Sequence, residues 1–462
     1  MSESGRFDEL LACPRCDKTP LKNTGNGYRC DACKVDYPLV GGIPWLFAEP
    51  DASLGEWRGR LHFEFQTLSQ DINRLDTDLK DKSLPESTRK RLELLRSASS
   101  EHRNALRDLL APIDVQSNTG GYESYLALRT RLPSDQGLHT YYQNVHRDWG
   151  WGDEENAASV DQIKEVAART DGGNTLGDTL VLGAGAGRLA YDIYREFETG
   201  TVIAVDFNPL LLLIADRVSK GESLELYEFP LAPRTLEDVA VKRELSAPEA
   251  AGDDFRLVLG DVLRPSFAAG QFDTVISPWL IDIVSEDLSV FSNRINALLK
   301  PGGRWINFGS LAFEHPRFTR RYSQQEALDL VTAAGFGTPE THEAVIPYMC
   351  SPASRHGRQE TVFSFAAVKT DKVKAPPRHK ALPDWIVTGK EPVPALQSFR
   401  TQAMTTQIYG FMMSLIDGKR SIADMAKLFE QQQLMSRQEA EPAIRNFLIK
   451  MFEDSERQSK LQ

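Results

Sequence analysis

A glycine-rich loop between a strand pattern and a helix pattern constrains the fold of this chain most strongly. Residues 179–182 have strand character, Gly183, Gly185 and Gly187 alternate with alanines, and apolar residues recur at helical spacing over 189–197. Glycines let the backbone turn tightly and approach a ligand, and a helix start offers free N–H groups. The pattern therefore predicts the first strand, loop and helix of an α/β nucleotide-type site.

The spacing within the loop narrows the choice of cofactor. A dinucleotide site uses G-x-G-x-x-G, whereas this loop reads G-x-G-x-G, which favours S-adenosylmethionine over NAD. The next strand pattern, 201–205, ends in Asp206, where a carboxylate at a strand tip can accept hydrogen bonds from ribose hydroxyls. Together these features predict a Rossmann-like class I methyltransferase core, an α/β fold with a mostly parallel seven-stranded sheet.

Length and charge limit the rest of the chain. A chain of 462 residues is expected to hold about three domains. The formal net charge of −11 argues against a large nucleic-acid-binding surface, because phosphate binding relies on clustered lysine and arginine. The start has no signal-peptide pattern and no run approaches the roughly 18 apolar residues of a membrane span. We expect a soluble cytoplasmic protein without a membrane partner.

Four of the five cysteines form two C-x-x-C pairs, Cys13 with Cys16 and Cys30 with Cys33, separated by 13 residues. Four thiolates satisfy tetrahedral zinc and leave no open position, so the spacing predicts a structural zinc ribbon over residues 8–50. A pair of disulfides and an iron site are the alternatives.

The residues after the second pair extend this prediction. The Y-P-x-x-x-G-I-P pattern within 37–44 resembles the small zinc-ribbon proteins that bind and activate methyltransferases. The resemblance implies a docking role for a ribbon fused to the core. A ribbon that only caps the N-terminus is the alternative.

A helical region is expected over 54–150, with a break near Pro85 between two long helices. Its last part, 141–152, is rich in aromatics and is expected to fold over the cofactor. Arg147 is suited to binding the methionyl carboxylate, because guanidinium recognises carboxylates with two hydrogen bonds. A surface pair of Arg147 with Asp148 beside a packed Trp149 is the alternative.

Four segments together resemble the carnosine N-methyltransferase family, over about residues 60–370. They are N-x-x-R-D-W at 144–149, G-A-G-x-G-R-L-A at 183–190, the strand and S-P-W-L-I-D of 272–282, and L-K-P-G-G-R-W-I-N-F-G at 299–309. The resemblance implies a catalytic core over 151–370. It also places six residues around S-adenosylmethionine: Asn144, Arg147, Gly183, Arg188, Asp206 and Asp261. The other two loop glycines, Gly185 and Gly187, are further candidates for cofactor binding.

For the acceptor, the resemblance implies that Asp282 holds a substrate imidazole and that Tyr348 lines the substrate pocket. A carboxylate that accepts the imidazole N–H orients the ring's lone pair, which is the nucleophile. A helix N-cap or loop acid is the alternative for Asp282. The family's imidazole-contacting histidine falls one residue later here, at His315, and residues 355–360 replace a tyrosine-rich patch. These differences from the family are compatible with an imidazole as the methyl acceptor but argue against carnosine as the substrate.

The C-terminal part is expected to be a linker over 371–383 and a helical or winged-helix domain over 384–462. The D-G-x-R-S-I-x-D-x-A pattern at 417–426 resembles small winged-helix modules that hold peptides, such as the one serving pyrroloquinoline quinone biosynthesis. That resemblance implies peptide binding; a DNA-binding winged helix and a plain packing domain are the alternatives.

The sequence therefore predicts an S-adenosylmethionine-dependent N-methyltransferase for a histidine-like imidazole in a small molecule or peptide. Its rivals are a protein or RNA methyltransferase that docks through ribbon and tail, and a non-catalytic S-adenosylmethionine-binding module.

Overall fold

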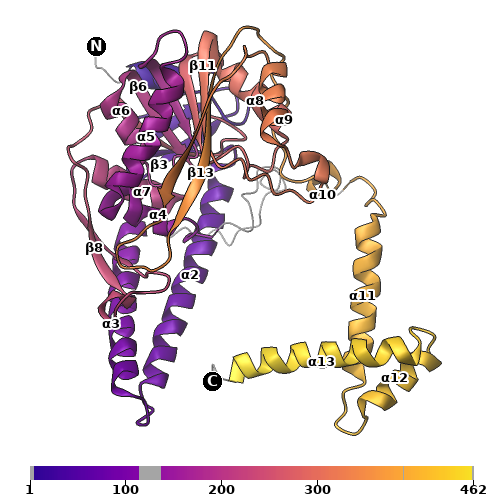
Figure 1. Ribbon diagram of the computed structural model, residues 1–462. Helices are drawn as coiled ribbons and strands as arrows, with labels where there is room; N and C mark the ends of the chain where they lie inside the picture. The colour runs from indigo at the N-terminus through magenta and orange to yellow at the C-terminus, as the bar shows by residue number, and fades with distance from the viewer. Residues whose placement is uncertain (1–4, 114–136, 389, 460–462) are drawn as a thin grey trace. The chain divides into compact units, whose positions relative to one another are not determined.

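The computed structural model describes residues 5–113, 137–388 and 390–459, and the chain divides into two compact units on either side of the Pro383–Asp384 bond (Figure 1). The first unit holds the sheet, the helices that cover it and the cysteine cluster. The second unit is a small helical domain with its own core.

Seven strands form the central sheet of the first unit. In spatial order they are β9 (Phe255–Gly260), β6 (Glu198–Asp206), β5 (Thr175–Leu182), β10 (Phe272–Pro278), β11 (Leu299–Gly309), β13 (Arg358–Val368) and β12 (Glu340–Tyr348). The first five are parallel, with Val181 opposite Ala204 and Ile276 in neighbouring strands, whereas β13 runs antiparallel to both of its neighbours. This arrangement confirms the predicted Rossmann-like sheet.

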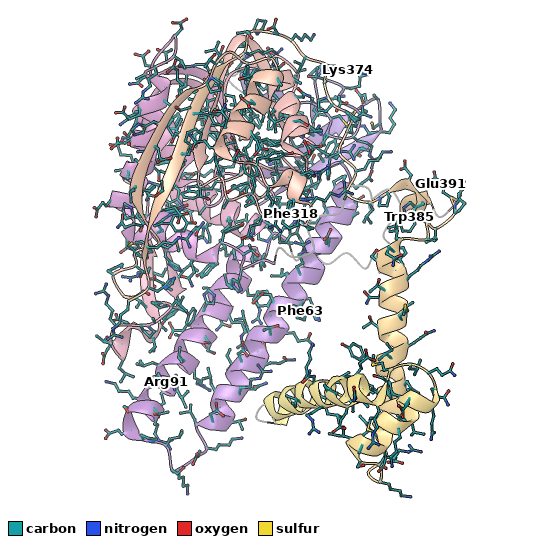
Figure 2. All side chains as sticks on the ribbon, turned by 45° about the vertical axis from the view of Figure 1, so that its right-hand side comes forward. Phe63, Arg91, Phe318, Lys374, Trp385 and Glu391 are labelled. Carbon is teal, nitrogen blue, oxygen red and sulfur yellow. The ribbon has the colours of Figure 1, made fainter. Side chains whose placement is uncertain are left out.

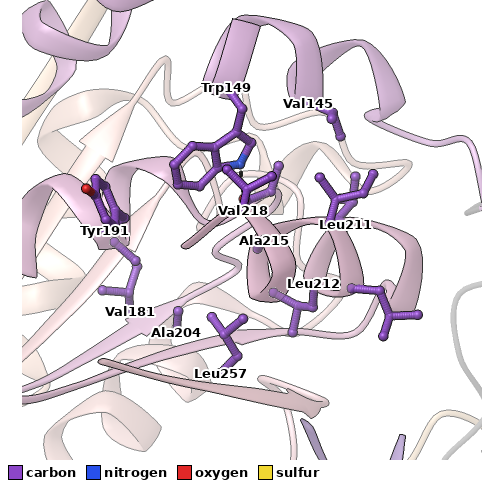
Figure 3. Packing of buried hydrophobic residues seen from close by; sticks show 14 of the residues in the cluster. Val145, Trp149, Val181, Tyr191, Ala204, Leu211, Leu212, Ala215, Val218 and Leu257 are labelled. Atoms are coloured by element: carbon purple, nitrogen blue, oxygen red, sulfur yellow. Dashed lines mark hydrogen bonds between the residues drawn. The ribbon is translucent and has the colours of Figure 1, made fainter. Parts of the chain in front are cut away.

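Helices cover both faces of this sheet because strands between crossover helices are buried on both sides. One face packs on α5 (Asp153–Ala167), α6 (Arg188–Glu196) and α7 (Pro209–Ser219), and the other on α8 (Leu288–Leu298) and α9 (Gln324–Ala333). Alternate residues of β5 serve the two cores: Val181 faces the first, while Leu180 and Leu182 face the second. Figure 3 shows Val181, Ala204 and Leu257 of the sheet below Trp149 and Tyr191.

The cysteine-bearing segment is continuous with the central sheet. After α1 (Gly5–Leu10), it forms β1 (Lys22–Asn23), β2 (Gly27–Cys30), β3 (Val35–Val40) and β4 (Ile43–Leu46). Strand β4 pairs in parallel with β9, with Trp45 opposite Leu259, so the sheet has eleven strands. The pairing covers the edge of β9, which would otherwise present unpaired backbone groups. The sequence did not indicate this junction.

A helical hairpin follows, with α2 (Pro50–Asp78) and α3 (Glu86–Leu110) side by side, as the break near Pro85 predicted. Figure 2 shows Phe63 on α2 and Arg91 on α3 in the part that extends away from the sheet. The chain then forms α4 (Tyr142–His146) and a π-helical turn, η2 (Arg147–Trp151). A separate hairpin of β7 (Leu224–Glu228) and β8 (Val241–Leu245), with a 3₁₀ turn η3 (Glu237–Val239) between the strands, was not predicted.

The second unit contains α10 (Asp384–Thr388), α11 (Gln397–Ser414), α12 (Ile422–Gln431) and α13 (Arg437–Ser459). Its core includes Met412, Met425 and Phe429, and Ser421 and Asp424 form the capping box that starts α12. No strand occurs among the described residues of this unit. No helix in the described ranges of the whole chain is both long and apolar enough to cross a bilayer.

Candidate active site

A cavity of about 710 Å³ lies at the carboxyl ends of the central strands. Its floor comes from residues at the carboxyl ends of four parallel strands, namely 183–186 after β5, 206–208 at the end of β6, 261–263 after β9 and 279–280 after β10. Open α/β sheets bind ligands at this edge, where loops from neighbouring strands converge. The volume is in the range of small-molecule and cofactor sites.

The glycine loop forms one wall of the cavity with a backbone that only glycine adopts readily. Gly183, Gly185 and Gly187 have φ angles of 68°, 57° and 84°. A Cβ at Gly183 would lie 2.9 Å from a methyl carbon of Leu280, whereas at Gly185 no protein atom lies within 4 Å of that position. Because Gly185 lines the cavity, its missing side chain leaves room for a ligand.

Two carboxylates stand at the tips of β6 and β9, and both line the cavity. Asp206 accepts hydrogen bonds from the backbone N–H of Gly185 and of Asn208, each at 2.8 Å, and Asp261 accepts one from Leu263 at 2.8 Å. Burial raises the pKa of Asp206 to about 6 and also raises the pKa of Asp261. Each carboxylate retains acceptor capacity for ligand hydroxyl or amine donors.

The segment at 144–149 covers the cavity from the helical side. Asn144 and Arg147 both line it, and Trp149 Nε1 donates to the carbonyl of Ala186 at 2.7 Å, which ties this segment to the glycine loop. Nε and Nη2 of Arg147 donate to Asp148 Oδ1 at 2.8 and 2.6 Å. Burial opposes the charge on Arg147, but Asp148 holds its pKa above the ordinary value. The Arg147–Asp148 pair of the alternative interpretation is therefore present, and it lies in the cavity.

Gly187 and Arg188, both predicted to bind the cofactor, do not line the cavity. Arg188 donates to the carbonyl of Asp148 at 2.7 Å and pairs with Asp192 at 2.8 Å. Asp192 and Asp148 keep the buried guanidinium charged and raise its pKa. The geometry therefore gives Arg188 a contact with the covering segment, which holds Asp148 and its neighbour Arg147 in place.

Three aromatic rings form another part of the cavity wall, next to Arg147, whose guanidinium carbon lies 5.9 Å from the centroid of the Tyr348 ring. Trp279 follows β10, and its ring centroid lies 5.0 Å from that of Tyr348 and 5.3 Å from that of Phe308. All three line the cavity. Trp279 has a φ of 49° and Met349, next to Tyr348, one of 55°, a strained backbone that is common at functional sites.

Glu155 on α5 fixes the end of this wall. Its carboxylate is buried and accepts hydrogen bonds from the backbone N–H of Met349 at 2.9 Å and of Cys350 at 2.6 Å. The contact spans 194 residues of sequence, and it sets where the strand carrying Tyr348 turns away from the cavity. Nothing in the sequence around Glu155 marked it, because it lies in a run of acidic residues at the start of a helix.

Asp282 lies next to the cavity and is not one of its lining residues. Its Oδ2 accepts hydrogen bonds from the backbone N–H of Ala312 at 2.8 Å and the hydroxyl of Ser310 at 3.3 Å, while its neighbour Ile283 lines the cavity. His315 is half-buried in the same loop, and its Nδ1 accepts a hydrogen bond from the backbone N–H of Arg317 at 3.0 Å. The loop also contains a 3₁₀ turn, η4 (Phe318–Arg320).

The structure thus brings seven of the predicted residues into one cavity: Asn144, Arg147, Gly183, Gly185, Asp206, Asp261 and Tyr348. Sequence reasoning did not single out Trp279, Phe308 or residues 379–382, which also line it. An aromatic residue after a strand is equally typical of the hydrophobic core. The composition of residues 379–382 predicts a linker.

The four cysteines of the two C-x-x-C pairs form a second candidate site. The Sγ atoms of Cys13, Cys16, Cys30 and Cys33 lie within 4.8 Å of one another, which is suitable for holding a metal ion. The Tyr37 hydroxyl lies 3.1 Å from Cys13 Sγ. All four thiols are free of disulfides.

Solved methyltransferase structures resemble this chain at low identity. One is phosphoethanolamine N-methyltransferase 2 of Haemonchus contortus with S-adenosyl-L-methionine, at 17% identity and a TM-score of 0.30 over 58% of this chain and 60% of that one. Another is the complex of the Haloferax volcanii Trm112 methyltransferase activator with a methyltransferase, at 13% identity and a TM-score of 0.34 over 52% and 100%. The N-methyltransferase NodS of Bradyrhizobium japonicum matches at 12% identity and a TM-score of 0.33 over 54% and 99%.

Sequence comparison identifies the family. Carnosine N-methyltransferase of Dictyostelium discoideum is 27% identical over 150 residues, which is 29% of this chain. The match spans about a third (32%) of the length of that curated relative. The family model described as "Carnosine N-methyltransferase" matches residues 136–370, just over half of the chain, and this range contains the glycine loop, both strand-tip carboxylates and Tyr348. The chain therefore belongs to the carnosine N-methyltransferase family.

Proposed function

We propose that this protein is an S-adenosylmethionine-dependent N-methyltransferase whose acceptor is a histidine-like imidazole in a small molecule or peptide. One observation carries the proposal. The cavity joins a glycine loop and two buried strand-tip carboxylates to an aromatic wall of Trp279, Tyr348 and Phe308. The first part suits a nucleoside cofactor and the second a flat acceptor ring.

The chain's own groups fit the cofactor. Asp206 suits the ribose hydroxyls, Asp261 suits the adenine amine, and Arg147 suits the methionyl carboxylate. Arg147 already pairs with Asp148, so a bound carboxylate would share or replace that partner. S-adenosylmethionine, when bound, supplies a methyl group on a positively charged sulfur.

For the acceptor, the chain's task is to orient a neutral imidazole. The ordinary imidazole pKa of about 6.5 leaves the ring largely neutral at pH 7, so no strong base is needed. We propose that the rings of Trp279 and Tyr348, which contact each other, pack against an acceptor ring, and that Asp282 accepts the N–H of that ring. Because Asp282 also holds Ser310 and Ala312, we propose that it links the acceptor to the loop that follows β11. Alignment of nucleophile and methyl group then supplies most of the rate.

A methyl-transfer assay tests the proposal. Full-length protein is given labelled S-adenosylmethionine together with carnosine, free histidine, histidine peptides or a cell extract separated by size. Label in an imidazole compound or peptide is the expected result. Label confined to protein or RNA, lost after protease or ribonuclease treatment, would favour a macromolecular acceptor instead. Binding of S-adenosylmethionine without transfer to any fraction would leave a cofactor-binding module.

We further propose that the cysteine cluster holds a structural zinc ion. Cys13, Cys16, Cys30 and Cys33 would hold the ion through four thiolates, which would leave no open position for a substrate, so its contribution would be to folding. Cysteines that bind a metal ion and do not form disulfides suit a reducing compartment, so we propose a cytoplasmic location. Metal analysis should find one zinc per chain, and a Cys30→Ser variant should lose it. Full metal content in that variant would contradict the assignment.

For the second unit we propose peptide docking, which would bring a peptide acceptor to the enzyme. Helix α11 exposes several large apolar side chains, Phe399, Met404, Tyr409 and Met413 among them, and Met404 is 64% exposed. Exposed apolar side chains are typical of peptide-docking surfaces. Fluorescence anisotropy with labelled histidine peptides should show weaker binding for Met404→Glu than for the control Gln402→Glu. Equal binding by both variants would argue against α11.

A further inference from the structure

Residues 377–382, which we call the strap, lie beyond the family match that ends at 370, yet they return to the cavity. His379, Lys380, Ala381 and Leu382 all line it, together with Asp261 and its neighbours at the tip of β9. The strap belongs to the same compact unit as the sheet. A segment with the composition of a linker therefore supplies part of the wall.

Two sets of contacts anchor the strap, one at helix α8 and the residues before it, and one at the cysteine cluster. The carbonyl of Pro377 accepts from Arg294 at 3.3 Å, and His379 Nδ1 lies 3.5 Å from Glu286, whose carboxylate also pairs with Arg294 at 2.6 Å. Glu286 and Arg294 are largely buried, so this side of the strap rests on ordered groups.

The second anchor reaches the first C-x-x-C pair. Nε and Nη2 of Arg378 contact Asp17 Oδ2 at 2.8 and 2.6 Å, and Asp17 directly follows Cys16. Asp17 has a φ of 61°, the left-handed turn that closes this pair. A metal ion bound by Cys13 and Cys16 would fix the conformation of this turn, and Asp17 in the turn binds Arg378.

We propose that the strap is an additional part of the cofactor site, closing its adenine end, and that the Arg378–Asp17 contact latches it to the metal-binding turn. The proposal rests on the function proposed above, because it takes the cofactor to be S-adenosylmethionine. The strap shields Asp261 and an adenine ring from water, and apolar Ala381 and Leu382 suit a flat ring. Burial raises the pKa of the Asp261 carboxyl, and the charge interaction with His379 opposes that rise. Cofactor affinity consequently depends on the state of the cysteine cluster.

Calorimetric binding of S-adenosylhomocysteine to full-length, zinc-loaded protein tests the latch without measuring turnover. The Arg378 side chain is about half exposed and the Asp17 side chain about two-thirds exposed, so their ion pair is expected to contribute only weakly. Arg378→Gln and Asp17→Asn should each weaken binding by about twofold to fivefold. The double variant should be no weaker than either single variant, because both remove one contact. Asn keeps the left-handed turn at position 17.

The control is Arg29→Gln, which removes an exposed ion pair with Asp36 elsewhere in the same ribbon. It should leave binding unchanged, and zinc content should be equal in all variants. If wild-type protein binds no S-adenosylhomocysteine, the proposed function fails together with the strap. If the wild type binds and both latch variants bind equally well, the latch alone is overturned.

Limited proteolysis tests whether the strap forms part of the cofactor site. Trypsin cleaves after Lys380, inside the strap, and mass spectrometry can follow that bond in every variant. Saturating S-adenosylhomocysteine should slow this cleavage at least fivefold, because a closed strap is not available to the protease. It should not slow cleavage after Lys82, in the turn between α2 and α3. Equal cleavage rates after Lys380 with and without the ligand would overturn the strap as part of the cofactor site.

Discussion

The two ends of the cavity are built in different ways. At the proposed cofactor end, the glycine loop, Asp206 and Asp261 stand at the carboxyl ends of three neighbouring parallel strands, and backbone N–H groups at this edge of the sheet position both carboxylates. At the acceptor end, Trp279 and Tyr348 come from segments about 70 residues apart that meet only in the folded chain. Glu155, from a third segment, fixes the backbone next to Tyr348.

We expect this difference to separate cofactor binding from the choice of acceptor. Backbone hydrogen bonds hold Asp206 and Asp261 at the proposed cofactor end, so changes in packing at the aromatic wall should leave both carboxylates in place. The acceptor end depends on side-chain packing between distant segments, so substitutions there can alter the acceptor and leave the cofactor in place. Variants at the two ends should therefore separate cofactor binding from turnover.

The largest effect is expected at the cofactor end. Asp206→Ala should weaken S-adenosylhomocysteine binding by more than about 100-fold, because two hydrogen bonds to a charged acceptor contribute about 1.5–3 kcal/mol each. Calorimetry on the full chain measures the change, with Asp36→Ala in the exposed part of the ribbon as the control. A loss below tenfold would mean that Asp206 does not bind the ribose.

The next effect is expected at the acceptor end. Asp282→Asn should lower kcat about 100-fold, the cost of a misplaced reacting group, and leave the S-adenosylhomocysteine Kd within twofold. Single-turnover kinetics and calorimetry on the same sample separate the two quantities. The exposed Asp329→Asn on α9 serves as the matched control. If kcat is unchanged, Asp282 only positions the loop through its hydrogen bond to Ala312. If the Kd for S-adenosylhomocysteine rises as kcat falls, cofactor binding and turnover do not depend on separate ends of the cavity.

A pH series sharpens the comparison. Burial raises the pKa of Asp206 to about 6, and the protonated carboxyl cannot accept hydrogen bonds from both ribose hydroxyls as well as the two backbone N–H groups. Cofactor affinity should therefore be constant above pH 7 and fall about tenfold per pH unit below pH 6. Folding stability has the opposite sign, because a raised carboxyl pKa favours the folded state as the pH falls from 6 towards 4. Asp206→Asn should remove the pH dependence of binding; a slope that persists would assign it to another group.

The smallest effect concerns the aromatic wall. Tyr348→Ala should raise the acceptor KM about twofold to tenfold, because a packed aromatic pair contributes about 0.5–1.5 kcal/mol. Tyr348→Phe keeps the ring against Trp279 and should change KM less than twofold. Steady-state kinetics with the identified acceptor measures both. If the two variants are equally impaired, the hydroxyl matters and the ring does not.

Much of the cofactor end was accessible from the sequence, because its signals are local. Strand character before Gly183 and before Asp206 placed both residues at strand tips, and the parallel sheet then brought them together. Arg188 could not be placed in this way. It stands one residue after the last loop glycine, yet its side chain turns to Asp148 and Asp192 instead of the cavity.

The sequence by itself determined the elements whose geometry is local: the strand, glycine loop and helix, the strand-tip acids, the two C-x-x-C pairs and the breaks between helices. Only the tertiary structure decided which distant segments meet. Strand β4 joins β9, Glu155 holds the backbone after Tyr348, and the strap returns to the cavity. The physical reason is that these contacts depend on burial and on hydrogen bonds between residues more than 100 positions apart, for which short sequence patterns carry no signal.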